Sequence, residues 1–346
     1  MTSPIAQRQL GSSGLQVGAI GFGAMMMTWC DPKEVKSDED AFASIKSAVD
    51  AGATFINSGA FYGNPGSETA NLELLRRFFD KYPDYVDRVV LSVKGGAKGG
   101  KIFSGIDASM ENLRADLDRI HTALGPKKKV DIYEVARVDP TMTIEEIMKN
   151  LVELKEEGHF KHIGVSEIHP TALRKAHAVH PIAAAEIEIS VFNLQPEALE
   201  VVKVAEELGI AVVAYSPLGR GMLTGRYRSP EDIPADDVRK KNPQFQGDNF
   251  KINLEIVDKL TAIAEKKGVS SGQLALAWLL QKSDKIIPIP GSGSAKRTVE
   301  NIQSVNVHLS SEELGEIEGI LSKFKPAGDR YANNGHGLLW GKGRED

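Results

Sequence analysis

Residues 38–58 read DEDAFASIKSAVDAGATFINS and contain the unit from which most of the chain is built. Asp38–Ala51 carries apolar residues at helical spacing, and Gly52 suits the left-handed position that ends many helices. Thr54–Ser58 follows as a short strand-like run. The same order of helix, break and strand recurs along the sequence, which predicts parallel strands joined by crossover helices.

The pattern yields eight strands and eight main helices. The predicted strands are Val17–Met25, Thr54–Ser58, Val89–Gly95, Val130–Val138, His162–Glu167, Ala183–Ser190, Ile210–Pro217 and Lys285–Pro290. The predicted helices are Asp38–Ala51, Glu68–Lys81, Asp107–Leu124, Thr143–Glu157, Pro170–Val179, Pro196–Leu208, Leu254–Lys282 and Ala295–Ser304. Eight such units fit an α/β fold of the (β/α)8 TIM barrel type, which takes ~250 residues plus insertions. An open doubly wound sheet would need a G-x-G-x-x-G turn after its first strand, and Gly21–Met26 lacks the third glycine.

Three segments fall outside the repeat, and we expect one barrel domain over residues 1–346. Residues 7–15 are expected to form a hairpin that plugs the barrel floor. Residues 219–250 form a long polar loop after the seventh strand. Residues 325–346 form a glycine-rich tail with Tyr331 and Trp340, expected either to close over the substrate or to lack fixed structure.

Composition excludes several classes of function. The 346 residues are 41% hydrophobic, enough for a large core, and the net charge of −5 without a long basic block disfavours nucleic acid. The single cysteine, Cys30, excludes an internal disulfide, and the eight histidines show no ligand spacing for a metal. The first residues lack the apolar core of a signal peptide, and no apolar run reaches the ~18 residues of a membrane helix. We expect a cytoplasmic protein; its oligomeric state stays open.

Tyr62 and Lys94 are candidates for acid catalysis because each follows or ends a predicted strand, where barrel enzymes place their chemistry. A tyrosine with a free pKa of ~10 holds its proton at neutral pH. A lysine ammonium nearby stabilises the phenolate left after proton transfer. Lys94 closes the apolar run Val89–Val93, where a bare charge would be costly without a purpose. As ordinary residues, Tyr62 would be a turn aromatic and Lys94 a surface lysine.

A second candidate site lies after the eighth strand. Gly291 and Ser292 lead into a helix that starts at Ala295, where backbone N–H groups and the helix dipole favour a phosphate. Lys296 and Arg297 add positive charge suited to a 2′-phosphate. The alternative is an ordinary helix start with a solvated basic face.

Several motifs in order resemble those of the aldo-keto reductases over roughly residues 8–324. They are Leu10-Gly11-x-x-Gly14, Phe55–Gly63, Val93–Gly95, Gly164–Ser166, Ala214–Leu218 and Ile289–Gly291 followed by Arg297 and Glu300-Asn301. The resemblance implies a small carbonyl substrate and NADPH bound without a Rossmann fold. It places Ser166, Glu167 and Glu186 near the nicotinamide amide and Tyr215 against the nicotinamide ring. It further places Ser216, Leu218, Gly221 and Leu223 at the pyrophosphate, and Arg297, Glu300 and Asn301 at the adenosine phosphate end.

The family's catalytic set of aspartate, tyrosine, lysine and histidine stands here as Asn57, Tyr62, Lys94 and Ala136. Asn57 can hold Lys94 by a hydrogen bond but not by charge, and Ala136 opens space in the substrate pocket. The departures resemble the fungal pyridoxal reductase branch, in which a glutamate commonly stands at the position of Ala60.

Glu134 shares a strand face with Ala136 by period-2 alternation, so both are expected to point into the barrel. A buried glutamate needs a partner. Our hypothesis is that Glu134 supplies part of the countercharge to Lys94 that Asn57 cannot. The alternative is that Glu134 pairs elsewhere, for instance with Arg137, or lies at the barrel rim.

These observations together predict an NADPH-dependent reductase of an aldehyde or ketone, pyridoxal-reductase-like, with Tyr62 as proton donor assisted by Lys94 and Asn57. One alternative is a reductase of a C=C or C=N bond, because the missing histidine lets a substrate sit differently. Another is an NADPH-binding regulator with little catalysis, against which the retention of both Tyr62 and Lys94 argues.

Overall fold

In the computed structural model, which describes residues 5–235, 237–332 and 338–345, eight parallel strands form one sheet. Their order is β10-β9-β8-β7-β6-β5-β4-β3, so each strand pairs with its neighbour in the sequence. The strands are β3 (Phe22–Gly23), β4 (Phe55–Gly59), β5 (Val90–Gly95), β6 (Ile132–Val135), β7 (His162–Ser166), β8 (Ala184–Glu188), β9 (Ala211–Tyr215) and β10 (Ile286–Pro288).

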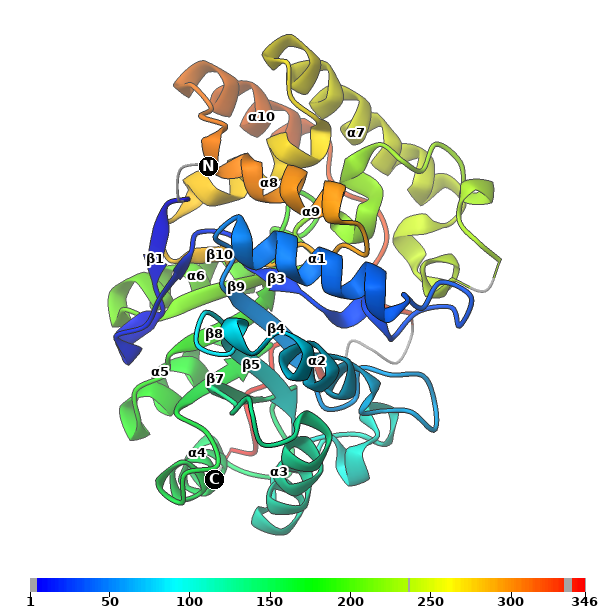
Figure 1. Ribbon diagram of the computed structural model, residues 1–346. Helices are drawn as coiled ribbons and strands as arrows, with labels where there is room; N and C mark the ends of the chain where they lie inside the picture. The colour runs from blue at the N-terminus through cyan, green and yellow to red at the C-terminus, as the bar shows by residue number, and fades with distance from the viewer. Residues whose placement is uncertain (1–4, 236, 333–337, 346) are drawn as a thin grey trace.

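Contacts between β3 and β10 close this sheet into a barrel. The backbone N–H of Gly21 donates to the carbonyl oxygen of Pro288 at 2.9 Å, and Gly23 forms an isolated parallel bridge with Gly291. A Cβ atom on Gly23 would lie 2.8 Å from the carbonyl oxygen of Ile289, so only glycine allows this close approach. The predicted TIM barrel is confirmed (Figure 1).

Ten helices in the described part of the chain surround the strands. They are α1 (Asp38–Asp50), α2 (Ala70–Lys81), α3 (Met110–Leu124), α4 (Ile144–Glu156), α5 (Pro170–Val179), α6 (Pro196–Leu208), α7 (Gly247–Lys267), α8 (Ser271–Lys282), α9 (Ala295–Gln303) and α10 (Ser311–Lys323). In Figure 1, α7, α8 and α10 group at the top and α3 and α4 at the bottom.

Two features of the helices differ from the predictions. The single predicted helix Leu254–Lys282 is two, because Gly268 adopts φ 73° in the left-handed region and Ser270 begins α8 with a capping box. The helix α10 was not predicted. It begins with a capping box of its own, in which the Ser310 side chain accepts from the N–H of Glu313.

The N-terminal hairpin closes one end of the barrel. Strands β1 (Gln7–Gln9) and β2 (Gln16–Gly18) pair antiparallel around a short turn, as predicted. Leu10 and Val17 are fully buried and pack with Phe55, Ile132 and Ile287 from inside the barrel. The predicted strand Val17–Met25 is therefore split into β2 and β3, since its first residues belong to the plug.

The long loop after β9 is ordered by short 3-10 helices and by contacts with the tail. Tyr227 and Phe245 are buried in it with ring centroids 6.4 Å apart. The Asn242 amide donates to the carbonyl oxygen of Arg330 at 2.7 Å, and in the adjoining helix α7 the Asn253 amide donates to that of Ala327 at 2.9 Å. Parts of the predicted tail segment 325–346 lie outside the described residues.

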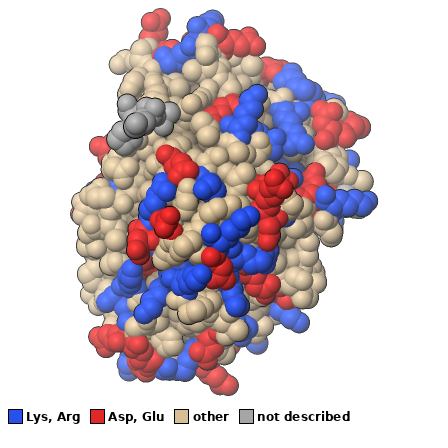
Figure 2. Space-filling model, viewed as in Figure 1, with Lys and Arg blue, Asp and Glu red and all other residues tan. Residues whose placement is uncertain are grey.

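The surface carries charges of both signs. Figure 2 shows Lys and Arg interspersed with Asp and Glu over the visible face. Among the described residues, none of the helices has the length and apolar content to span a bilayer.

Candidate active site

Four polar side chains from different strands meet inside the barrel, near the carboxyl ends of the strands. Asn57 lies on β4, Lys94 on β5, Glu134 on β6 and Glu186 on β8. Each is at most 4% exposed. The strands bring them together because alternate residues of every barrel strand face the lumen.

Lys94 is held by two of these groups. Its ammonium donates to Oδ1 of Asn57 at 2.6 Å and to both carboxylate oxygens of Glu186, at 2.8 and 2.9 Å. Nδ2 of Asn57 in turn donates to Oε2 of Glu186 at 2.6 Å. Asn57 thus contacts Lys94 as predicted, and the charge that an amide cannot supply comes from Glu186 on the facing strand.

Burial alone would lower the pKa of Lys94, but the Glu186 carboxylate, with smaller contributions from Tyr62 and Glu134, outweighs it and raises that pKa above the ordinary value. Lys94 is therefore a fixed cation at neutral pH. The buried lysine and glutamate compensate each other, which a single buried charge could not do.

Glu134 lies close enough to Lys94 to contribute to raising its pKa, as hypothesised, but the larger contribution comes from Glu186. One carboxyl oxygen accepts from the Ser92 hydroxyl at 2.9 Å, and the other is buried with no hydrogen-bond partner among the described groups. Burial, and next the nearby Glu186 carboxylate, raise the pKa of Glu134 well above the ordinary value. The direct ion pair of Lys94 is with Glu186. The one hydrogen bond that Arg137 donates within the described part of the chain goes to the carbonyl oxygen of Ala136 and not to Glu134.

Tyr62 lies directly beyond β4, above this cluster. The Lys94 ammonium is 5.1 Å from the centroid of its ring, within cation–π range. Burial raises the pKa of Tyr62 to about 12, although the Lys94 charge acts in the opposite direction. Tyr62 is therefore protonated at neutral pH and lies beside a cation that stabilises its phenolate.

The wall around Tyr62 is apolar. Tyr62, Phe61, Ala97 and Ala136 form one buried cluster, and Trp29 packs against it with its ring centroid 5.6 Å from that of Tyr62. Ala60 is also buried beside it, at 3% exposed. The side chain of Ala136 is a methyl group and donates no hydrogen bond, unlike a histidine at that position.

A second charged cluster lies at the same end of the barrel. Arg330 of the tail is 2% exposed and bridges Glu167, at 3.1 Å, and Glu188, at 3.3 Å. The hydroxyl of Tyr215 donates to Oε1 of Glu167 at 2.8 Å and lies 3.0 Å from that of Tyr331. Sequence reasoning missed Arg330, although an arginine in a tail that also carries Tyr331 and Trp340 was an available signal.

The other residues expected at the nicotinamide and pyrophosphate follow β7 and β9. Ser166 ends β7, and its hydroxyl is buried with no hydrogen-bond partner among the described groups. Ser216 follows β9 with φ 48°. Leu218, Gly221 and Leu223 lie in or just before the 3-10 helix Gly219–Thr224. Glu186 lies deeper in the barrel, where its carboxylate accepts hydrogen bonds from Lys94.

The residues expected to bind a phosphate lie at and before the start of α9. The helix begins at Ala295, and Lys296 and Arg297 in its first turn are exposed, with no ion pair to any described carboxylate. Gly291 and Ser292 precede it in the loop after β10. Glu300 accepts from the Ser270 hydroxyl at 2.7 Å, and Asn301 lies one residue further along the helix.

Comparison with known proteins agrees with this geometry. The family model described as "Aldo/keto reductase family" matches residues 19–322. Aldo-keto reductase str7 of Strobilurus tenacellus is 36% identical over 342 residues, covering 97% of this chain and 98% of that protein. Probable pyridoxal reductase 2 of Schizosaccharomyces pombe is 35% identical over 325 residues, covering 92% and 96%.

Two further similarities extend this result. Aldo-keto reductase yakc [NADP(+)] of Schizosaccharomyces pombe is 36% identical over 336 residues, covering 94% of each chain. The solved structure of the glycerol dehydrogenase AKR11B4 from Gluconobacter oxydans superposes with a TM-score of 0.80 at 22% identity, covering 93% of this chain and 97% of that one, which supports the fold. The chain is an oxidoreductase and belongs to the aldo-keto reductase family.

Proposed function

We propose that this protein is an NADPH-dependent reductase of an aldehyde or ketone, with Tyr62 as proton donor and Lys94 as its activator. The observation that carries the proposal is the buried arrangement of Lys94, Asn57 and Glu186, with the ammonium 5.1 Å from the Tyr62 ring. Burying an ion pair costs desolvation free energy. A buried ion pair beneath a tyrosine at the carboxyl ends of barrel strands is therefore typical of a catalytic site.

Carbonyl reduction adds a hydride to carbon and a proton to oxygen. Tyr62 donates the proton: its O–H bond breaks as the new O–H bond of the alcohol forms, and a phenolate is left. With a pKa of about 12, Tyr62 keeps this proton until the carbonyl oxygen becomes basic. Lys94 then stabilises the phenolate through its fixed positive charge.

Glu186 positions Lys94. The ammonium donates two hydrogen bonds to the Glu186 carboxylate and one to Oδ1 of Asn57, so its three N–H donors are occupied and its place under Tyr62 is fixed. We propose that Glu186 here does the work expected of an acidic residue at position 57. Its carboxylate reaches the ammonium from β8 instead of β4.

The residues present suit NADPH, which would supply the hydride. The Ser166 hydroxyl, buried and without a hydrogen-bond partner in the described structure, suits the amide of the nicotinamide. Lys296 and Arg297, in the first turn of α9 and without an ion pair to a described carboxylate, suit a phosphate. One of the relatives carries NADP(+) in its name, which supports the same cofactor here.

The apolar wall of Trp29, Phe61 and Ala136 suits a substrate with a flat ring. A ring carbonyl such as pyridoxal is the most specific candidate, supported by a probable pyridoxal reductase among the relatives.

Fluorescence titration with NADPH and NADH, followed by a panel of aldehydes, ketones, enones and imines read as NADPH consumption, tests the proposal. Tyr62→Phe should lower turnover by about 10²–10⁴-fold, the usual contribution of a general acid, while NADPH still binds. Unchanged turnover in that variant would refute the role of Tyr62. Turnover of enones or imines only would identify a different reductase, and tight NADPH binding with no turnover would identify a regulator.

A further inference from the structure

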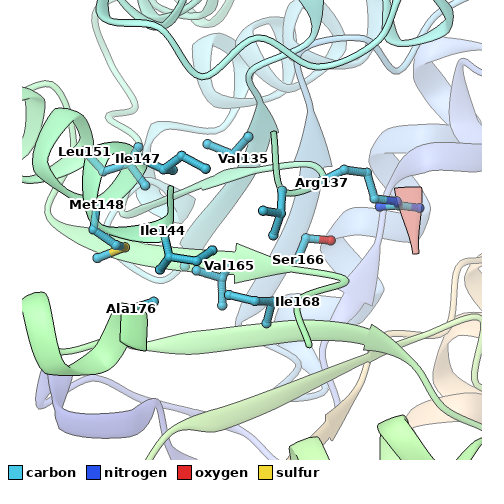
Figure 3. Close-up of a pocket in the computed structure, with 12 residues that line it drawn as sticks. Val135, Arg137, Ile144, Ile147, Met148, Leu151, Val165, Ser166, Ile168 and Ala176 are labelled. Carbon is cyan, nitrogen blue, oxygen red and sulfur yellow. The ribbon is translucent and has the colours of Figure 1, made fainter. Parts of the chain in front are cut away.

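Arg137 brings a positive charge to the mouth of the barrel. It follows β6 and lines an apolar pocket enclosed by β6, β7, α4 and α5. Figure 3 shows its side chain turning away from the apolar groups of that pocket, such as Ile147 and Met148, so that the guanidinium lies beyond Ser166. The charged end of Arg137 therefore belongs to the mouth of the barrel and not to the pocket.

The guanidinium lies among active-site groups and is poorly satisfied. Burial alone would lower the pKa of Arg137, but Tyr215, Tyr331, Glu167 and Tyr62 lie close enough to raise it. Within the described part of the chain, its one hydrogen bond runs from Nη1 to its own neighbour's carbonyl oxygen, that of Ala136, at 2.6 Å. Four of its five N–H donors are left for other partners.

Among the described ion pairs around Arg137, the positive charges outnumber the negative ones. Glu167 is paired with Arg330, and Glu188 is paired with both Arg330 and Arg220. Two carboxylates therefore face two guanidiniums, and Arg137 is a third cation with no ion pair to any described carboxylate. Beneath them, Lys94 and Glu186 cancel each other. A half-buried guanidinium left over in this way favours an anionic ligand.

The aromatic wall described above adjoins this cation. The next residue of the chain, Ala136, lies in the cluster of Phe61, Tyr62 and Ala97, against which Trp29 packs. The ring of Phe103 extends the wall at 6.0 Å from Trp29 and is 88% exposed. Apolar surface for a flat ring and a cation for an anion thus lie side by side.

We infer that Arg137 binds a carboxylate carried by the substrate, and that the substrates of this enzyme are aromatic aldehydes with an acidic group. The inference rests on the proposed reductase function. A carboxylate is favoured because its two oxygens match the fork of a guanidinium. The carbonyl group points toward Tyr62 and the carboxylate toward Arg137. One substrate can therefore accept the proton of Tyr62 and form an ion pair with Arg137.

Matched substrates of equal shape test this. The kcat/KM for NADPH-dependent reduction is measured for 3- and 4-formylbenzoate and for the neutral 3- and 4-formylbenzamides. We expect at least one acid to be preferred over its amide by about ten- to a hundredfold, the range of a charge-assisted hydrogen bond. Arg137→Gln should bring that ratio close to one, and Arg137→Lys should leave an intermediate ratio. Arg76→Gln, which removes an exposed positive charge from α2, should preserve the wild-type ratio.

The outcomes separate this inference from the proposed function. Amides reduced as well as acids by the wild-type enzyme would overturn the role of Arg137 and leave the reductase in place. Reduction of neither, with turnover of other aldehydes or ketones in the panel, would overturn the substrate class and leave the reductase in place. No turnover of any aldehyde or ketone would overturn both. An Arg137→Gln variant with weakened NADPH binding in fluorescence titration would assign the cation to the cofactor instead. Thermal melting identifies a variant that fails to fold. The acid-to-amide ratio of kcat/KM for the wild-type enzyme tests the inference even in that case.

Discussion

Two buried clusters of charge lie at the same end of this barrel, and they are built from different kinds of sequence. The Lys94 cluster, with Asn57, Glu134 and Glu186, comes entirely from strands. In the Arg330 cluster the carboxylates of Glu167 and Glu188 come from the barrel, but the cation comes from the irregular tail. Strands hold the first cluster rigidly under Tyr62, whereas the second ties the tail onto the barrel.

This difference predicts that replacing Lys94 lowers activity, whereas replacing Arg330 lowers stability. Lys94→Met should lower kcat by about 10³–10⁴-fold, since the phenolate of Tyr62 would lose its stabilising charge. Steady-state kinetics measures the loss, and NADPH titration with circular dichroism serves as control. Turnover within a few fold of wild type would mean that the Lys94 cluster, like the Arg330 cluster, has only a structural role.

Arg330→Met should lower the free energy of unfolding. Removing one partner of a buried ion pair costs about 3–5 kcal/mol, because the remaining charge stays buried. Urea unfolding measures this change. Arg344→Met is the matched control in the same tail: its pair with Glu146 is about half exposed, and exposed pairs contribute about 0–1 kcal/mol. Equal effects of the two variants would contradict the view that Arg330 ties the tail down.

The same difference between strands and irregular segments explains which site residues could be predicted from the sequence. Alternation placed Glu134 correctly inside the barrel, because strand periodicity is a local property. Lys94 was expected at the site from its position at the end of a strand, and Asn57 from the family resemblance. The pairing of Lys94 with Glu186 was missed because the two lie 92 residues apart and meet across the lumen. The inward register of Ala184, Glu186 and Glu188 in a buried strand was the available signal.

Irregular segments were harder to predict, for a physical reason. The tail has no periodic pattern, and its order comes from individual contacts such as Trp340 Nε1 donating to Gln195 at 2.8 Å. The break between α7 and α8 was missed for the opposite reason: Gly268 and Ser270 are strong local signals, but apolar periodicity continues across them.

The carboxylate that holds Lys94 can be moved from β8 to β4 by two substitutions. Glu186→Gln should lower kcat by about a hundredfold, because Lys94 would lose the countercharge and the two hydrogen bonds that hold it in place. Adding Asn57→Asp to this variant returns a carboxylate to the ammonium from β4 and should restore a large part of the rate. Steady-state kinetics on both variants and on Asn57→Asp alone checks this. No recovery in the double variant would show that Glu186 serves something other than Lys94.

Glu134 should show the smallest effect, and it depends on pH. Its pKa is raised in the folded protein, mainly by burial and next by Glu186, whereas in the unfolded chain it lies near ~4.3. A raised pKa means that the stability contributed by the bound proton is complete below the unfolded value and is lost as pH rises through the folded value. Glu134→Gln has no such proton to lose.

The free energy of unfolding of Glu134→Gln, relative to wild type, should therefore increase between pH 5 and 8, by at most about 1.4 kcal/mol per pH unit. Urea unfolding at several pH values measures this, with Glu156→Gln on the exposed face of α4 as the control whose difference stays flat. A difference that stays flat between pH 5 and 8 would mean that Glu134 is already ionised in the folded protein over that range. In that case two carboxylates would face Lys94, and the strand-built cluster would carry a net negative charge.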